Sequence, residues 1–267
     1  MNHLLRAVAP IADSGWELID SEARQRLTPA LAARRLVDFA GPRGWGHSAT
    51  DLGRTEPLAA SPQEGVSARR RRVLALAELR VDFTVSLSEL ADRERGALEV
   101  DLASLDEAAH RIAVAENIAI LHGWSEAGII GVVEATPHEA RPLGEDPELY
   151  PRVVAGAVEL LLSSGVGGPY GMALGREQYR RVVETAEHGG HLLLDHLREI
   201  LDGPIVWAPG LDGAVVLSRR GGDFVLDCGQ DLSVGYHRHD ERAVHLYIEE
   251  SFSFLAATPE AAVALSA

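Results

Sequence analysis

The sequence predicts an α+β fold, and three observations carry this expectation. Residues 104–122 have the apolar periodicity of a long helix, residues 41–77 are rich in glycine and proline, and strand-like runs gather near the carboxyl end at residues 205–208, 214–218 and 244–255. Helices and strands that are segregated along the chain are typical of this class. With 267 residues, 46% of them apolar, the chain can bury the core of one large domain or two small ones.

The first predicted helix spans residues 14–27. Ser14 and Glu17 have the spacing of a capping box, in which the two side chains satisfy free backbone N–H groups at the start of a helix. One helical face is formed by Trp16, Ile19, Ala23 and Leu27. Pro29 then disturbs the pattern, because proline lacks the N–H group that a helix interior needs.

Residues 41–77 are predicted to form an extended or flexible arm. The stretch contains glycine or proline at eight positions, which prevents a long helix: 41, 42, 44, 46, 53, 57, 62 and 65. A long loop of this kind inside a compact domain is usually functional. The arm includes the basic run 69–72, which could bind an anion, line a subunit contact or simply be a solvated flank.

A strand and the longest helix follow the arm. Residues 80–87 alternate apolar and polar side chains, which is typical of a strand with one buried face. In the helix at 104–122, Ser104 and Glu107 form a second possible capping box, and Gly123 supplies the stop. Its buried face is expected to consist of Leu105, Ala109, Ile112, Ala113, Glu116 and Ile120.

Three shorter helical patterns are predicted between the long helix and the late strands. They span residues 149–164, 176–186 and 191–201, and Gly165 ends the first of them. We detect no internal repeat and no low-complexity segment.

Composition excludes several classes of function. The net charge of −15 argues against nucleic acid as the main ligand, because phosphates reward clustered cations. All 25 basic residues are arginine, so no lysine chemistry is available. The single cysteine, Cys228, cannot form an internal disulfide and is expected to be a packed thiol. No apolar run reaches the roughly 18 residues of a membrane span, so we expect a soluble, cytoplasmic protein with no membrane partner.

The motifs that could carry chemistry are all incomplete. Glu107 and His110 form half of a diiron pattern without its second copy, and His237, His239 and Asp240 lack a further fixed metal ligand. The stretch 123–127 departs from a nucleophile elbow, and 165–170 departs from the dinucleotide fingerprint. We therefore assign no catalytic residue and no metal site.

Two distant segments together resemble the encapsulins, a family of linocin-type shell proteins. They are Met1–Pro10, with the sequence MNHLLRAVAP, and Gly229–Tyr236, with the sequence GQDLSVGY. The resemblance runs in register to about residue 265, with further matches at residues 34–38, 41–42, 78–80, 168–170 and 219–224. Several moderate matches in the same order are more specific than any one of them.

The resemblance implies a fold and a division of the chain. The fold is that of the tailed-phage major capsid protein, of Hong Kong 97 type, with a P-domain, an A-domain and an extended E-loop. Residues 1–40 correspond to the N-terminal helix and the start of the P-domain, 41–77 to the E-loop, 78–135 and 220–267 to the P-domain with its spine helix, and 136–219 to the A-domain.

The resemblance also implies a function. The chain would be a shell subunit without catalytic activity, which assembles with copies of itself into an icosahedral cage of about sixty subunits, the T=1 class. The cage would enclose a cargo protein, such as a dye-decolorizing peroxidase or a ferritin-like protein, through a C-terminal targeting peptide. Alternatives are a major capsid protein of a virus or prophage and, less favoured, a bacteriocin or protease.

The resemblance finally implies two sets of functional residues. The cargo peptide would bind Arg34, Asp38, Phe39, Leu232, Ser233, Val234 and Tyr236. The fivefold pore would be lined by Glu187, His188, Gly189, Gly190 and His191. Some relatives bind a flavin against a tryptophan at the position where this chain has Ser88, so we expect no flavin and no other cofactor.

Overall fold

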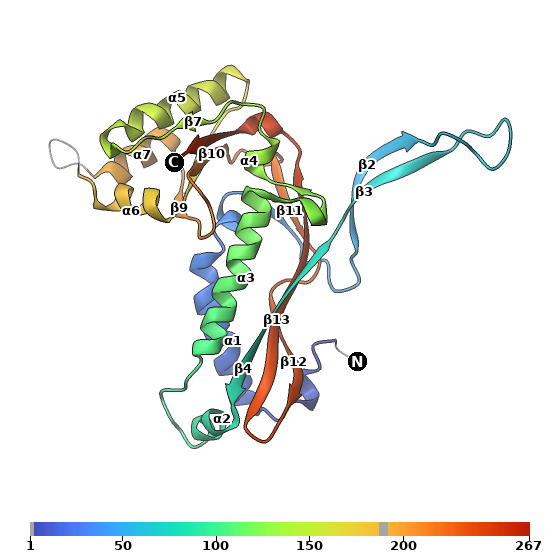
Figure 1. The fold of residues 1–267 in the computed structure, drawn as a ribbon, viewed down its shortest axis with the longest axis vertical. Helices are drawn as coiled ribbons and strands as arrows, with labels where there is room; N and C mark the ends of the chain where they lie inside the picture. Colours follow the sequence, from blue (N-terminus) through green and yellow to red (C-terminus); the bar gives the residue numbers. More distant parts are fainter. Residues whose placement is uncertain (1–2, 187–191) are drawn as a thin grey trace.

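The computed structural model describes residues 3–186 and 192–267 of the chain. Two layered regions are joined by long elements, and a two-stranded arm extends away from them (Figure 1). The helical segments are η1 (Arg6–Val8), α1 (Asp13–Ala30), η2 (Ala33–Arg35), α2 (Leu87–Glu94), α3 (Ala103–Leu121), η3 (Ser125–Ala127), α4 (Val132–Ala135), η4 (Pro147–Leu149), α5 (Tyr150–Ser163), α6 (Arg176–Glu184), α7 (Leu193–Leu201) and η5 (Pro259–Ala261).

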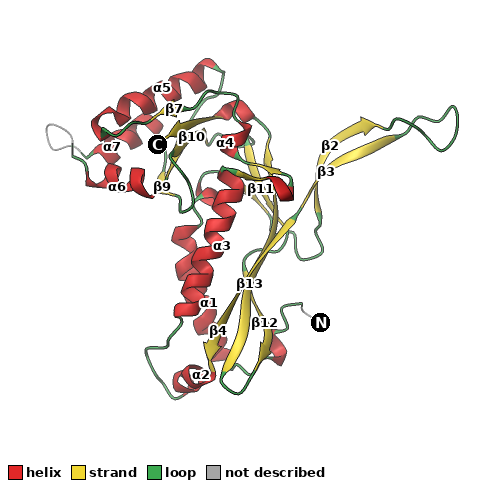
Figure 2. Ribbon diagram, viewed as in Figure 1, coloured by secondary structure: helices red, strands yellow, loops and turns green. Residues whose placement is uncertain are grey.

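The strands divide between two larger sheets and two short pairs (Figure 2). Their bounds are β1 (Asp38–Ala40), β2 (Ala49–Pro57), β3 (Arg69–Ala75), β4 (Ala77–Ser86), β5 (Gly123–Trp124), β6 (Ile129–Ile130), β7 (Arg141–Pro142), β8 (Tyr170–Leu174), β9 (Ile205–Trp207), β10 (Ala214–Ser218), β11 (Phe224–Cys228), β12 (Ser233–His239), β13 (Ala243–Ala256) and β14 (Ala262–Ser266).

The long strand β13 organises the first sheet. Strands β11 and β12 both pair antiparallel with β13, at successive parts of its length, and β4 pairs antiparallel along its other side. β1 is added in parallel to β11. Helices α1 and α3 pack against this sheet through a core that includes Ile19, Leu105 and Leu246.

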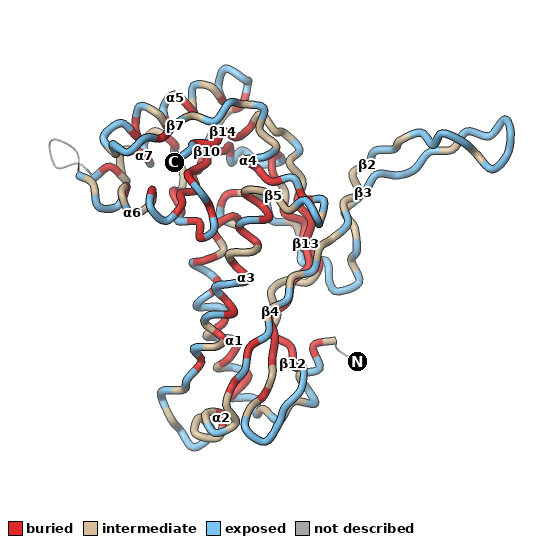
Figure 3. Tube along the Cα trace, in the orientation of Figure 1, coloured by how far each residue is buried: buried red, intermediate tan, exposed pale blue. Residues whose placement is uncertain are grey.

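The second sheet lies at the other end of the molecule, with the order β7-β14-β10-β8-β9. Its central strands β8 and β10 are buried along their whole length, because side chains from α5 and α7 cover them, among them Val154, Leu161 and Leu197. The buried segments in Figure 3 are therefore concentrated in this layered region and along the α3–β13 contact.

The arm is the hairpin formed by β2 and β3, which contributes no residue to either core. Its base is held by the buried carboxylate of Asp227 on β11. This carboxylate accepts hydrogen bonds from Arg43 Nε and Thr50 Oγ1, each at 2.6 Å, and His47 Nε2 lies 3.3 Å away. The predicted extended stretch is thus an ordered hairpin rather than a flexible loop.

Both predicted capping boxes are wrong, although their helices exist. α1 begins at Asp13 after Ala12, so Ser14 lies inside the first turn and caps nothing, and the helix runs through Pro29. α3 begins at Ala103, and the Ser104 hydroxyl instead accepts a hydrogen bond from the Thr84 N–H at 3.1 Å. Tertiary contact with β4 therefore takes the oxygen that local spacing assigned to the helix end.

Candidate functional site

A cavity of about 390 Å³ opens between α1 and β12. Apolar side chains and polar or charged side chains line it in equal number: Leu4, Arg6, Asp20, Ala23, Arg24, Leu27, Thr28, Leu31, Arg34, Asp231, Leu232, Ser233, Val234 and Ile248. α1 contributes Ala23 and Leu27, which lie on one helical face, and Leu31 follows directly after the end of the helix. The size is within the usual range for small-molecule and peptide pockets.

The strand beside this pocket lies at the edge of its sheet. β12 pairs with β13 on one side, and on the other side the Tyr236 N–H donates to the Leu4 carbonyl at 2.8 Å. An edge strand offers backbone N–H and C=O groups to an added extended chain. The pocket therefore combines apolar and charged side chains with a strand edge.

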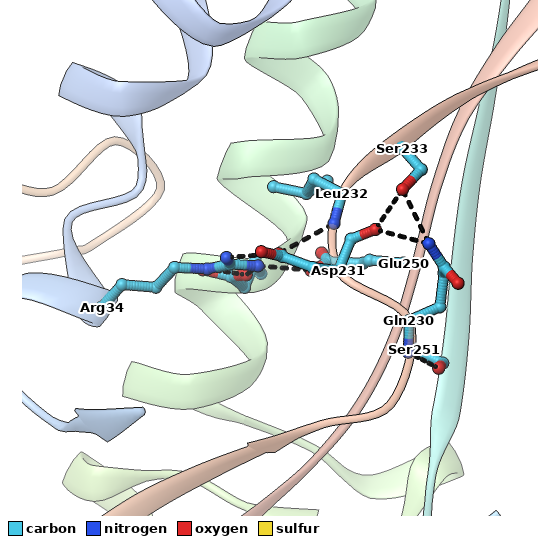
Figure 4. A network of polar contacts seen from close by, with 8 residues as sticks. Arg34, Gln230, Asp231, Leu232, Ser233, Glu250 and Ser251 are labelled. Atoms are coloured by element: carbon cyan, nitrogen blue, oxygen red, sulfur yellow. Dashed lines mark hydrogen bonds and ion pairs between the residues drawn. The ribbon is translucent and has the colours of Figure 1, made fainter. Parts of the chain in front are cut away.

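A buried ionic cluster forms one end of the pocket (Figure 4). Arg34 donates from Nε to Glu116 Oε2 at 2.7 Å, from Nη1 to Asp231 Oδ1 at 2.7 Å and from Nη2 to Glu250 Oε2 at 2.8 Å. The side chains of Glu116 and Glu250 are completely buried, whereas that of Asp231 is 42% exposed. Asp231 Oδ1 also accepts from the Leu232 N–H, which fixes the turn into β12.

The electrostatics of this cluster follow from burial. Burial alone would lower the pKa of Arg34, but the adjacent carboxylates of Glu116 and Glu250 raise it above its ordinary value. The pKa of Glu250 is raised, first by burial and then by repulsion from Glu116. One guanidinium thus faces three carboxyl groups, and the cluster retains a proton on Glu250 at pH values where an exposed glutamate has lost it.

Four of the seven predicted peptide-binding residues line the pocket: Arg34, Leu232, Ser233 and Val234. The other three lie outside its lining. The Asp38 carboxylate accepts a hydrogen bond from the Gly222 N–H, and the Phe39 ring lies 5.0 Å from the Arg34 guanidinium. The Tyr236 side chain is buried, and its hydroxyl lies 2.6 Å from His239 Nδ1.

Sequence reasoning missed several residues of the pocket. Asp231 stands inside the segment 229–236 on which the resemblance rests, and Ala23 and Leu27 belong to the predicted apolar face of the first helix. Glu116 belongs to the predicted buried face of the long helix, and a carboxylate in such a position indicates that a cation lies nearby. Nothing in the sequence pointed to Glu250, whose contact with Arg34 joins residues far apart in the chain. The predicted pore residues 187–191 lie outside the described residues.

The other constellations occupy ordinary structural positions. Glu107 and His110 are exposed on α3, and Asp240 Oδ2 lies 2.9 Å from His245 Nε2 instead of joining His237. Ser88 is in the first turn of α2, where its N–H donates to the Ser86 hydroxyl. Within residues 3–186 and 192–267, no group of three or more acidic, histidine or cysteine side chains has the arrangement of a metal site.

The chain matches, over residues 1–253, a family model described as encapsulating protein for peroxidase. It is also 47% identical over 270 aligned residues to a type 1 encapsulin shell protein of Rhodospirillum rubrum, and the alignment covers 99% of this chain and 96% of that protein. The chain belongs to the encapsulin family. The expected resemblance is therefore confirmed, and because these relatives are shell proteins, this encapsulin is a structural, shell-forming protein rather than an enzyme.

Solved structures agree on the fold of this encapsulin. A virus-like particle from Pyrococcus furiosus matches with a TM-score of 0.67 at 17% identity, covering 94% of this chain and 99% of that one. The capsid of the myovirus phage XM1 matches with a TM-score of 0.54 at 10% identity, covering 90% and 91%. The predicted α+β fold of the tailed-phage capsid, Hong Kong 97 type, is thus confirmed. None of the described helices is both long and apolar enough to cross a bilayer.

Proposed function

We propose that this encapsulin closes into a T=1 cage of about sixty copies and encloses a cargo protein by binding that protein's C-terminal targeting peptide. The observation that carries the proposal is the pocket between α1 and β12. In this assignment α1 faces the interior of the cage, residues 41–77 form the E-loop that reaches a neighbouring copy, and residues 136–219 form the A-domain around the fivefold pore.

An extended peptide is the occupant that the pocket suits. Leu27, Leu31 and Leu232 provide apolar contact for alternate side chains, and the edge of β12 provides backbone groups for a peptide main chain. The buried Arg34 cluster fixes Asp231 and Leu232 at the pocket end, so the site is largely formed before a peptide arrives. A preformed site costs less ordering entropy on binding.

The cargo is an oligomeric enzyme of the ferritin-like or dye-decolorizing peroxidase class, in the cytoplasm. A weak site for each peptide is sufficient, because several tails of one oligomer engage several shell subunits together. The segment 187–191, which lies outside the described residues, is the proposed lining of the fivefold pore.

The pocket assignment is tested by loading. The variant Leu31→Ser with Leu232→Ser removes apolar surface from the pocket, and Leu149→Ser with Leu162→Ser removes the same side chains from exposed positions on η4 and α5. Each variant is co-expressed with a fluorescent protein that carries the C-terminal targeting peptide of an encapsulin cargo protein. We expect intact cages in both cases and loss of fluorescence only from the first. Equal loading would remove the pocket from the proposal.

The stoichiometry is tested by expressing the chain alone. Electron microscopy after size-exclusion chromatography should show uniform hollow particles, whose diameter and symmetry give the subunit number. Particles with a larger triangulation number would contradict the T=1 assignment without affecting the peptide site.

A further inference from the structure

The arm is a hairpin that belongs to neither of the two larger sheets. β2 and β3 form an isolated two-stranded sheet with exposed apolar side chains at Leu58, Val66 and Val73. A single two-stranded hairpin is marginally stable in water, so beyond its base at Asp227 a contact outside the subunit would stabilise it.

Charge is distributed unevenly between the arm and the rest of the chain. Residues 49–75 contain five arginines and three acidic residues, so their net charge is +2. Because the whole chain has a net charge of −15, the remaining residues have a net charge of −17. The arm is therefore a cationic projection from a strongly acidic body. Copies of this chain have complementary charges at these two surfaces.

Two arginines on the arm face each other without a carboxylate between them. Arg54 on β2 and Arg72 on β3 are directly opposed across the hairpin, so both side chains are on one face. The neighbouring pair on this face, Glu56 and Arg70, forms an ion pair. In the described part of the chain, neither Arg54 nor Arg72 has an ion pair or a side-chain hydrogen bond. Like charges in directly opposed positions destabilise a hairpin, and a contact with carboxylates would relieve that repulsion.

The body of the same subunit does not provide that contact. Figure 1 shows β2 and β3 leaving the body and pointing away from it, and both guanidiniums belong to exposed residues. A carboxylate that pairs with Arg54 or Arg72 therefore has to come from another molecule.

We propose that Arg54 and Arg72 form a two-guanidinium clamp that binds a carboxylate pair on the acidic body of a neighbouring copy. Guanidinium groups form two parallel hydrogen bonds to each carboxylate, which gives such a contact direction as well as charge. The inference rests on the proposed contact of the arm with a neighbouring subunit. It assigns the specificity of that contact to the face of the hairpin that carries Arg54 and Arg72.

The test compares two double variants with the same change in net charge. Arg54→Ala with Arg72→Ala removes the clamp, and Arg69→Ala with Arg71→Ala removes two arginines from the opposite face of the same hairpin. We expect the first variant to lose most of its cages in light scattering and electron microscopy, and the second to keep them. The first variant also relieves like-charge repulsion within the hairpin, so its failure to assemble would not reflect a weaker arm.

Three outcomes would contradict the proposed role of Arg54 and Arg72. Cages from the Arg54→Ala, Arg72→Ala variant at the wild-type level would show that the clamp is not needed. Equal losses in both double variants would indicate a simple effect of arm charge. Normal cages that lose only co-purified nucleic acid, measured by absorbance at 260 and 280 nm, would indicate an RNA contact. A wild-type chain that forms no cages would instead contradict the proposed function.

Salt provides an independent measurement. Raising ionic strength from about 50 mM to about 500 mM screens exposed charges, so wild-type cages should dissociate more readily as salt rises. Cages of the Arg69→Ala, Arg71→Ala variant should retain this dependence. Residual cages of the variant without the clamp should show a weaker dependence, and an unchanged dependence would contradict the inference.

Discussion

At the scale of single residues, the cluster around Arg34 determines how the pocket end responds to pH. Both buried glutamates place an Oε2 atom against the same nitrogen, Arg34 Nη2, at 2.5 and 2.8 Å. One positive charge cannot compensate both buried carboxylates together with the partly exposed Asp231, so a proton stays with the buried pair. The first prediction concerns that proton.

We predict that Glu250→Gln makes the stability of the protein less dependent on pH. Because burial and Glu116 raise the pKa of Glu250, its contribution is fully present below about pH 4 and is lost as pH rises through the folded-state pKa. Each tenfold difference in proton affinity is worth about 1.4 kcal/mol. The melting temperature of the variant relative to wild type should therefore increase from acidic to neutral pH. The exposed Glu99→Gln serves as the control, and a difference independent of pH would contradict the assignment.

The second residue-scale prediction concerns Cys228, which is completely buried on β11. Burial raises the pKa of its thiol to about 12, so about one thiol in ten thousand is ionised at pH 8. We expect no alkylation by iodoacetamide in the native protein and rapid alkylation in guanidinium chloride, measured by mass spectrometry. Rapid alkylation of native cages would show that β11 opens. The sequence-based prediction of a packed thiol is confirmed by its burial.

At the scale of elements, the sequence predicted periodic segments well and their ends poorly. The apolar face of α3 is buried at every position named in advance, because one period of 3.6 residues is maintained over the whole helix. Ser14 and Ser104 failed as caps, since Ala12 and Leu102 precede these helices. α2 was missed although Ser86 and Glu89 have the spacing of a capping box, and Ser86 does cap it.

The candidate pocket was only partly predictable for the same physical reason. Residues 232–234 could be assigned because they lie in one continuous segment of the chain. Asp38 and Phe39 follow Arg34 closely in sequence, but β1 pairs with β11 and directs this segment away from the pocket. The partner of a buried charge, such as Glu250 for Arg34, depends on sheet topology that no local pattern contains.

The third prediction concerns the joint between arm and body. Asp227→Ala removes the acceptor of the Arg43 and Thr50 hydrogen bonds, so the base of the arm should open more often. One hydrogen bond to a charged group is worth about 1.5–3 kcal/mol, which predicts cleavage by trypsin at arm arginines at least about tenfold faster. Asp51→Ala is the matched control, because its ion pair with Arg71 is exposed at both ends. Equal cleavage rates would show that Asp227 does not hold the joint.

At the scale of the whole molecule, the body, meaning the residues outside the arm, contains both hydrophobic cores, and the arm contains none. The two core clusters contain no residue between positions 40 and 76, whereas strands on either side of the arm, β1 and β4, are fixed in the first sheet. Folding of the body therefore does not depend on the hairpin. If the arm contacts a neighbouring copy as proposed, the stability of the hairpin depends on assembly, and arm order is coupled to cage formation.

This separation leads to the last prediction. Replacing residues 50–74 with a short Gly-Ser linker should leave a folded subunit, because both cores and both larger sheets remain complete. The truncated chain should keep its far-ultraviolet circular dichroism apart from the lost hairpin, and it should unfold cooperatively. Light scattering after size-exclusion chromatography should give the mass of a monomer or small oligomer instead of a cage, since the element proposed to reach a neighbouring copy is gone. Cages of normal diameter would show that contacts between the bodies are sufficient for closure. A truncated chain that fails to fold would show that the hairpin stabilises the sheet through β4 and the Asp227 joint.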